Sequence, residues 1–464
     1  MFKLSNFLLI HLVVVLAMSL ISSNILAKTL YVNESTGNDS INYAENNEDN
    51  PWATIGRAAW GSTNRNNPNP GQAAQAGDTV TVMAGTYVAT QMTNERHQPS
   101  WNPVNSGTSG NRIVFQADGQ VILQSVMGGA NGPVIGSFQR DYITWDGFFV
   151  DEPNIETRAD TGPVVIADAD NVILQNLEIR GKEAQWLDNH NGIRLEFATN
   201  SVLRGNKIYG IRRMGGINRN AAAIMTYDST NILIENNEIS DSDDAMYLKN
   251  QSHNFTIRHN LVYDIDGPGL RLSQIGCRAD DPDDGADVYQ NVFRNNVVGI
   301  SFSPIQSDGH NVPYCTSPYV DDIQLVNNTI VNNLVGIYIK GDALNFNRNV
   351  LIENNILSGS DTGINNEDSG IGSAFTMQNN LYFDNNVYGQ LGSGSITLTN
   401  MQDMFGVDIG SFEANPLFVD EAGGDFRLQE SPPSPAINAG MDVLDLDGDG
   451  ITAEPINFGA YILS

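Results

Sequence analysis

The residues best suited to chemistry lie in two short stretches, Asp243–Lys249 and Gly269–Leu272. The first holds two adjacent acids, a tyrosine and a lysine, and the second holds an arginine. Carboxylates transfer protons or bind a metal ion, lysine acts as a base, and the arginine fork binds carboxylates. Together they suit proton transfer on an anionic substrate, provided that the fold brings the two stretches together.

Both stretches belong to a pattern that is repeated between residues 171 and 386. Each repeat has an alternating apolar strand, an asparagine turn, and a small residue that opens a second strand. A strand-based period of roughly 20 to 40 residues predicts a parallel β-helix, in which every repeat forms one coil. Asparagines at the same turn of each coil are expected to hydrogen-bond along the stack. We assign this turn to Asn206, Asn237, Asn260, Asn296, Asn328, Asn355 and Asn380.

Alignment of the coils on the small residue predicts two columns of outward-facing side chains. The first column is Arg194, Met225, Tyr247, Arg271, Ser301, Tyr338 and Asn365. The second is Glu196, Tyr227, Lys249, Ser273, Ser303, Lys340 and Glu367. Six of these residues form one exposed candidate surface across four coils: Arg194, Glu196, Tyr227, Tyr247, Lys249 and Arg271.

This surface has the features of a sugar-binding groove. A neighbouring cation lowers the pKa of a lysine, so Arg271 would make Lys249 a better general base. Tyrosines give sugar rings flat surfaces to stack on and supply a second proton-transfer group. The competing interpretation is an ordinary mixed polar face of a solenoid. Lys340 favours it, because this lysine repeats the Lys249 motif with no acidic pair beside it.

The charge of the chain restricts its partners. A formal net charge of −30 gives no basic face for phosphates, so nucleic acid is excluded as a partner. An acidic polysaccharide would be repelled at long range and would need a local basic patch or a bridging Ca²⁺. We expect a monomer.

The ends of the chain point to export and to a capped solenoid. Residues 1–27 read as a signal peptide and predict a secreted protein, extracellular or periplasmic, with no membrane span after its removal. Residues 28–110 are expected to form an N-terminal cap and the first coils. A short helix is expected there, with Asn50 as its N-cap, Pro51 at its first position and its end near Trp60. The β-helix would occupy 111–394 and a C-terminal cap 395–464.

Residues 278–314 interrupt the repeat and are flanked by Cys277 and Cys315. In an oxidising compartment a disulfide between them would close this insertion at its base; two separate buried thiols are the alternative.

The chain resembles known families at two levels. The segments Pro51–Ile55, Gly77–Val82 and Ser434–Gly440 resemble the ends of secreted right-handed β-helix proteins, which implies an all-β, right-handed parallel β-helix with a helical N-terminal cap. Asp243–Lys249 also looks like the paired-aspartate strand of the polygalacturonase family, but that family's other aspartate and its histidine are missing here.

The layout of the candidate surface also resembles the sixth polysaccharide lyase family, which cleaves alginate and chondroitin. That resemblance implies Lys249 as the base, Arg271 as the cation near the leaving oxygen, and Asp243 or Asp244 as a Ca²⁺ ligand. The chain departs from the family's pattern in two ways. Ser242 replaces the first acid, and Lys249 and Arg271 stand in different outward-facing columns, whereas the family's lysine and arginine share one column.

Two other acidic segments could bind Ca²⁺, residues 280–287 and residues 445–449. The second begins like an EF-hand loop, but Ile456 stands where the loop needs a glutamate. Plain acidic turns are the alternative for both.

The leading hypothesis is a secreted protein that cleaves a uronic-acid polysaccharide by β-elimination, with a lysine base and assistance from Ca²⁺. A non-catalytic polysaccharide-binding or cell-surface protein is the alternative.

Overall fold

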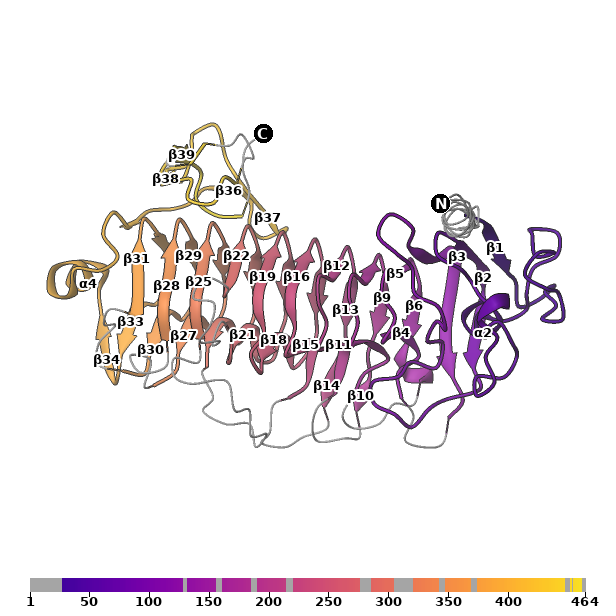
Figure 1. Ribbon diagram of the computed structural model, residues 1–464. Coiled ribbons are helices and arrows are strands. Elements are labelled where there is room, and N and C mark those ends of the chain that lie inside the picture. The colour runs from indigo at the N-terminus through magenta and orange to yellow at the C-terminus, as the bar shows by residue number, and fades with distance from the viewer. Residues whose placement is uncertain are drawn as a thin grey trace, which may run out of the picture.

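The computed structural model describes residues 27–127, 132–155, 161–184, 190–213, 220–275, 285–303, 320–341, 347–368, 374–446, 451–452 and 454–460. These residues form an elongated parallel β-helix, with strands of successive coils stacked side by side (Figure 1). The predicted signal peptide, except for Ala27, lies outside the described residues, as do Cys277, Cys315 and residues 278–284 and 304–314 of the predicted insertion. The part between them, residues 285–303, is a regular coil whose strands pair with both neighbouring coils, so it does not interrupt the repeat. Within the described part of the chain, no helix is long and apolar enough to cross a bilayer.

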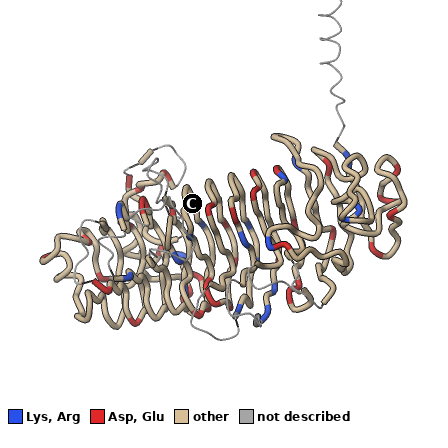
Figure 2. Tube along the Cα trace, turned by 60° about the horizontal axis from the view of Figure 1, so that its bottom comes forward, with Lys and Arg blue, Asp and Glu red and all other residues tan. Residues whose placement is uncertain are grey.

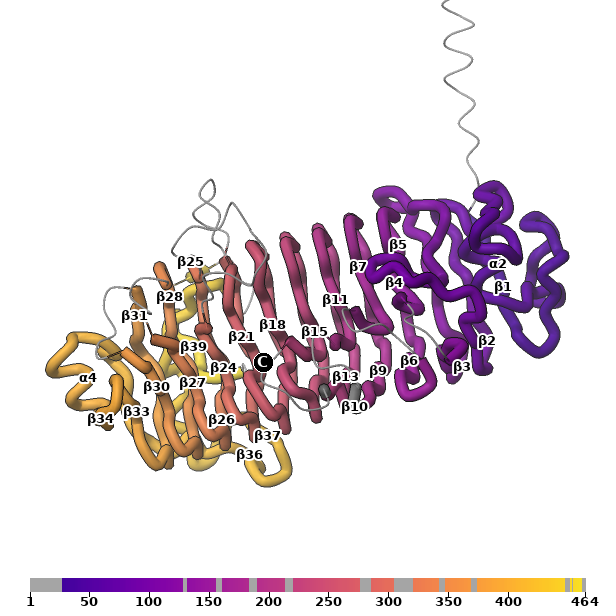
Figure 3. The backbone as a smooth tube through the Cα atoms, turned by 90° about the horizontal axis from the view of Figure 1, so that it is seen from below, coloured from indigo at the N-terminus to yellow at the C-terminus, as the bar shows by residue number. Residues whose placement is uncertain are grey.

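Each coil gives one strand to an eleven-stranded sheet, which is parallel except for its last pair (Figure 3). Its strands are β4 (Ile135–Phe138), β7 (Val164–Ala167), β11 (Asn191–Glu196), β15 (Ala222–Tyr227), β18 (Asp244–Lys249), β21 (Pro268–Leu272), β24 (Val298–Phe302), β27 (Val335–Ile339), β30 (Thr362–Asn366), β33 (Val387–Leu391) and β34 (Gly394–Ile396).

The remaining strands of the coils join a 22-stranded sheet. Its strands are β1 (Thr29–Val32), β2 (Thr79–Ala89), β3 (Ile113–Ser125), β5 (Ile143–Asp146), β6 (Phe149–Asp151), β8 (Ile173–Gln175), β9 (Glu178–Arg180), β12 (Val202–Arg204), β13 (Lys207–Tyr209), β16 (Thr230–Glu235), β17 (Glu238–Ser240), β19 (His253–Arg258), β20 (Leu261–Tyr263), β22 (Ala286–Tyr289), β23 (Val292–Arg294), β25 (Val320–Val326), β26 (Thr329–Val331), β28 (Asn347–Glu353), β29 (Ile356–Ser358), β31 (Phe375–Gln378), β32 (Leu381–Phe383) and β35 (Phe412–Glu413).

Shorter elements complete the described structure: β10 (Glu183–Ala184), β14 (Arg212–Arg213), β36 (Phe418–Asp420), β37 (Asp425–Leu428), β38 (Gly440–Met441), β39 (Pro455–Ile456), α2 (Ile55–Trp60), α4 (Leu398–Phe405), and the 3₁₀ turns η1 (Pro70–Gln72) and η2 (Glu152–Asn154).

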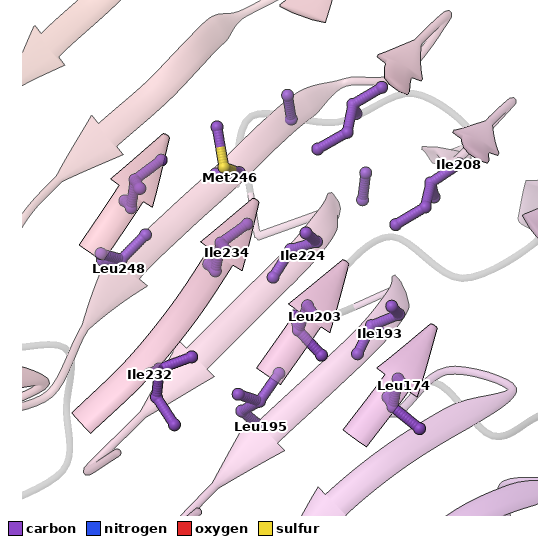
Figure 4. Packing of buried hydrophobic residues seen from close by; sticks show 14 of the residues in the cluster. Leu174, Ile193, Leu195, Leu203, Ile208, Ile224, Ile232, Ile234, Met246 and Leu248 are labelled. Carbon is purple, nitrogen blue, oxygen red and sulfur yellow. The ribbon is translucent and has the colours of Figure 1, made fainter. Parts of the chain in front are cut away.

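The core is a stack of aliphatic side chains from both sheets (Figure 4). Ile224 pairs in register with Met246, and Met246 with Leu270, so one inward column continues from coil to coil. Because neighbouring coils present the same kind of side chain at the same position, each coil buries its apolar face against the next one.

A ladder of asparagines stabilises one turn of the coils. The Nδ2 of Asn260 donates to the Oδ1 of Asn291 at 2.9 Å, and the backbone N–H of Asn260 donates to the same oxygen at 3.0 Å. The bonds continue through Asn206, Asn237, Asn260, Asn291, Asn328, Asn355 and Asn380. The ladder was predicted, but its assignment to Asn296 was wrong. Asn296 belongs to a second ladder, where its N–H donates to Asn333 Oδ1 at 2.9 Å.

The N-terminal helix is shorter than predicted. Thr54, not Asn50, is its N-cap, and the helix covers Ile55–Trp60. The residues before it are held in an extended conformation, because Trp52 pairs with Val32 of β1. Asp39 Oδ1 also accepts hydrogen bonds from the N–H groups of Ala53 and Thr54, at 2.8 and 3.1 Å.

The segment after the last coils has two parts. Leu398 and Met401 of α4 are buried and close the end of the main core. The chain then turns back along the outside of the solenoid, where β36 to β39 lie (Figure 1). There Phe418, Phe426 and Phe458 form a second apolar cluster with residues of the large sheet such as Ile356.

Candidate functional site

The candidate site lies on the outer side of β11, β15, β18 and β21, which are successive neighbours in the eleven-stranded sheet (Figure 3). The register matches the two predicted columns. Arg194 pairs with Met225, Met225 with Tyr247, and Tyr247 with Arg271. In the second column, Glu196 pairs with Tyr227 and Tyr227 with Lys249.

Cations and aromatic rings alternate across these strands, and we call Arg194, Tyr227, Lys249, Tyr247 and Arg271 the cation–aromatic stack. The Tyr227 ring has the Arg194 Cζ at 4.1 Å and the Lys249 Nζ at 4.6 Å from its centroid. The Tyr247 ring has the Lys249 Nζ at 5.2 Å and the Arg271 Cζ at 4.8 Å. The negative face of an aromatic ring attracts a cation at these distances, so each ring links two cations that would otherwise repel each other.

A carboxylate lies at each end of the stack. Glu196 Oε2 is 2.9 Å from the Nη2 of Arg194. At the other end, Nη2 of Arg271 lies 3.1 Å from Oδ2 and 3.3 Å from Oδ1 of Asp244. Gly267 of the next coil makes room for this carboxylate, since a Cβ there would lie 2.3 Å from Asp244 Oδ1.

Glu196 also contacts two basic side chains from a distant segment. Arg96 Nη2 lies 2.8 Å from its Oε1, and His97 Nε2 lies 2.8 Å from its Oε2. Burial raises the pKa of Glu196, but the His97 hydrogen bond and the charges of Arg194, His97 and Arg96 outweigh burial and lower it to about 2. Glu196 is therefore ionised at neutral pH and anchors the segment that carries Arg96.

Lys249 occupies the centre of the stack. Its Nζ lies 3.4 Å from Asn220 Oδ1, and the side chain of Asn191 contacts both Arg194, at 3.3 Å, and the Asn220 carbonyl, at 3.3 Å. These two asparagines hold the polar ends of neighbouring coils together. Sequence reasoning missed Asn191, Asn220, Arg96 and His97. Asn220 lies within the repeat, residues 171–386, whereas Arg96 and His97 lie outside it and have no signal in the repeat pattern.

The predicted exposure of this surface was wrong. In each of the strands β11, β15 and β18, all six residues are buried. Tyr247 is 1% exposed and Lys249 is 5% exposed. The side chain of Arg271 is 15% exposed, against 4% for Arg194. Alternation gives the direction of a side chain but not what covers it, and cations already lie on the rings of Tyr227 and Tyr247. The expected use of these rings as sugar-stacking surfaces therefore does not fit the geometry.

The assignment of Asp243 and Asp244 as Ca²⁺ ligands stays a prediction. Both oxygens of Asp244 face the Arg271 guanidinium, and the described residues bring no group of three metal-ligating side chains together. A cation at Asp244 would compete directly with Arg271. Of the two other acidic segments predicted as Ca²⁺ sites, residues 280–284 and 447–449 lie outside the described residues.

The electrostatic surroundings of the stack differ from those of the whole chain. Acidic residues outnumber basic ones along the solenoid (Figure 2), and the chain holds 54 acids and 24 lysines and arginines. With Lys249 protonated, three cations (Arg194, Lys249, Arg271) face two carboxylates (Glu196, Asp244), a local net charge of 3 − 2 = +1; with Lys249 neutral it is 2 − 2 = 0.

Comparisons with known proteins agree with the fold. Residues 157–307 match the family model described as right handed beta helix region. A rhamnogalacturonan lyase structure is similar at a TM-score of 0.52 and 17% identity, covering 89% of this chain and 96% of that one. The pectate lyase Pel9A gives 0.51 and 13%, covering 94% and 97%. The complex of XylC with xylose gives 0.50 and 13%, covering 84% and 87%. No curated protein sequence matches the chain. The chain is thus a right-handed parallel β-helix.

Proposed function

We propose that the protein is an exported, carbohydrate-active enzyme that cleaves an acidic polysaccharide by β-elimination at the cation–aromatic stack. The observation that carries this proposal is the position of Lys249 between the rings of Tyr227 and Tyr247. Each of these rings also contacts an arginine. The similarity to lyase structures supports the same class, and the apolar run Phe7–Ile21 supports export.

The reaction requires a base, a means to neutralise the substrate carboxylate, and a proton for the leaving oxygen. Lys249 would remove the proton next to the uronate carboxylate. That electron pair then forms a C4–C5 double bond as the C4–O bond breaks, and Lys249 returns the proton to the leaving oxygen. Loss of water and nearby cations both favour the neutral form of an amine that acts as base.

Arg271 is the residue of the stack that would meet the substrate carboxylate first, because it is the most exposed of the three cations. A guanidinium binds a carboxylate through two parallel hydrogen bonds and withdraws charge from it, which acidifies the neighbouring C–H. The guanidinium of Arg271 would attract a uronate to this part of an otherwise acidic protein.

The test is the ultraviolet absorbance of unsaturated uronate ends after incubation with alginate, pectate or chondroitin, with and without Ca²⁺. Lys249→Met keeps most of the length of the side chain and removes the base, so it should abolish product formation. Lys340→Met is the matched control, because Lys340 ends the same motif directly after β27 but is exposed. Thermal unfolding of both variants shows whether they fold.

Burial of Tyr247 and Lys249 favours a second candidate, a non-catalytic polysaccharide-binding protein in which the stack is purely structural. Absence of unsaturated product from every uronan, with wild type and a folded Lys249→Met indistinguishable, would reject the lyase and leave this candidate.

A further inference from the structure

A separate pocket lies in the N-terminal cap, away from the cation–aromatic stack. It is formed where the loop after β1 meets α2 and the end of β2, at the indigo end of the solenoid (Figure 1). Its volume is about 390 Å³. Pockets of a few hundred cubic ångströms are the usual size for one small ligand or one to two sugar units.

Three aromatic residues line this pocket: Trp60, Tyr87 and Trp101. Trp60 lies against Gly56, where a Cβ would come within 2.6 Å of its Cζ3, so the bare backbone of Gly56 leaves space for the indole. The Nε1–H of Trp60 is buried, and no acceptor for it exists among the described residues. Buried donors are normally paired. The case for a ligand at this wall therefore rests on the aromatic side chains that line the pocket.

The polar part of the pocket consists of acceptors and hydroxyls. Asp39 is fixed in position by the Oγ1 of Thr54, which donates to its Oδ2 at 2.8 Å, and by two N–H groups on its Oδ1. Each carboxylate oxygen accepts two hydrogen bonds, so Oδ2 keeps capacity for a ligand hydroxyl. Glu34 is the second acid, and threonines and Gln91 complete the lining.

The charges select the ligand. Among the described residues that line the pocket are two carboxylates and neither a lysine nor an arginine. Arg57 does not line the pocket but lies beside Asp39, whose backbone carbonyl accepts a hydrogen bond from the Arg57 Nε at 3.1 Å. The two carboxylates that do line the pocket repel a uronate and accept hydrogen bonds from sugar hydroxyls or an ammonium group. Aromatic walls pack against the C–H faces of a sugar ring.

We propose that this pocket binds a saccharide unit that has no carboxylate, as a second carbohydrate site in the N-terminal cap. Its ligand chemistry is opposite to that proposed for the stack, where Arg271 would bind a uronate carboxylate. The two sites together would suit a heteropolysaccharide or a cell-wall matrix in which acidic and non-acidic sugars occur side by side.

The experiment is isothermal titration calorimetry of the full mature protein with neutral cello- and xylo-oligosaccharides, chitosan oligosaccharides and oligogalacturonate. Val88 is 44% exposed and lines the pocket, so Val88→Trp fills the pocket without altering the core. Val126→Trp is the matched control, because Val126 is 40% exposed and does not line the pocket. Binding of a non-acidic oligosaccharide should weaken by roughly tenfold or more in Val88→Trp and stay unchanged in Val126→Trp.

Glu34→Gln distinguishes a neutral saccharide from one that carries an ammonium group. Loss of its charge should weaken a chitosan oligosaccharide strongly and a neutral one little. The proposal is overturned if only oligogalacturonate binds, if no probe binds, or if the two tryptophan variants behave alike. Lys249→Met should leave this binding unchanged, so failure of the lyase proposal and failure of this one are distinguishable.

Discussion

The ammonium nitrogen of Lys249 lies 4.6 Å from the centroid of the Tyr227 ring, which carries the guanidinium of Arg194 4.1 Å from the same centroid. One ring therefore joins cations of two coils that do not pair directly with each other, because β15 lies between β11 and β18. Buried cations of like charge are costly unless something compensates them. Here the tyrosine rings and the carboxylates of Glu196 and Asp244 provide that compensation, and the stack links the coils on which it lies.

We predict that Tyr227→Leu lowers the free energy of unfolding by about 2–4 kcal/mol, because two desolvated cation–π contacts and part of the buried area are lost. Tyr227→Phe keeps the ring and should cost less than about 1.5 kcal/mol. Denaturant unfolding followed by circular dichroism measures both values. Equal losses in the two variants would show that the ring does not hold Arg194 and Lys249.

The pH dependence of stability should reveal Glu196. Its pKa falls from 4.5 to about 2 in the folded chain, so its contribution is fully present above pH 4.5 and is lost as the pH falls toward 2. At pH 7 this contribution amounts to roughly 3 kcal/mol, which Glu196→Gln should remove.

The difference in unfolding free energy between wild type and Glu196→Gln is the quantity to follow. It should be constant from pH 7 down to about 5 and shrink below pH 4.5. A difference that stays constant down to pH 3 would show that Glu196 is not the stabilising charge.

Part of the site was predictable because the repeat is regular. The period of two along a strand gives the direction of each side chain, so the columns of Arg194 and Lys249 follow from alignment alone. The sequence gives no signal for Arg96, since its contact with Glu196 joins residues 100 positions apart and lies outside the repeat. Asn291 and Asn296 were confused because both stand near a turn, and only backbone pairing shows which ladder each one joins.

The asparagine ladder should be a major source of stability. Asn260→Ala removes the acceptor for the N–H of Asn237, at 3.0 Å, and the donor to the carbonyl of Ile234, at 2.9 Å. Unsatisfied buried polar groups cost about 1–3 kcal/mol each, so we expect a loss of about 2–5 kcal/mol.

Asn386→Ala is the control for the ladder, because this exposed asparagine donates to Asp361 at 2.9 Å outside both ladders. It should change the free energy of unfolding by less than about 1 kcal/mol. Comparable losses in Asn260→Ala and Asn386→Ala would contradict the stabilising role of the ladder.

Removal of Ca²⁺ tests the role of Asp244. Because its carboxylate faces Arg271 at 3.1 Å, Asp244→Asn should lower the melting temperature by weakening this pair, and by the same amount in EDTA as in Ca²⁺. If Asp244 were a metal ligand, Ca²⁺ would stabilise the wild type and not the variant, since a ligand that binds the native state raises its stability by mass action. Asp243→Asn, next to it on a half-buried position, is the matched variant. A melting-temperature difference that appears only in Ca²⁺ would identify the aspartates as ligands, whereas a constant difference assigns Asp244 to the orientation of Arg271.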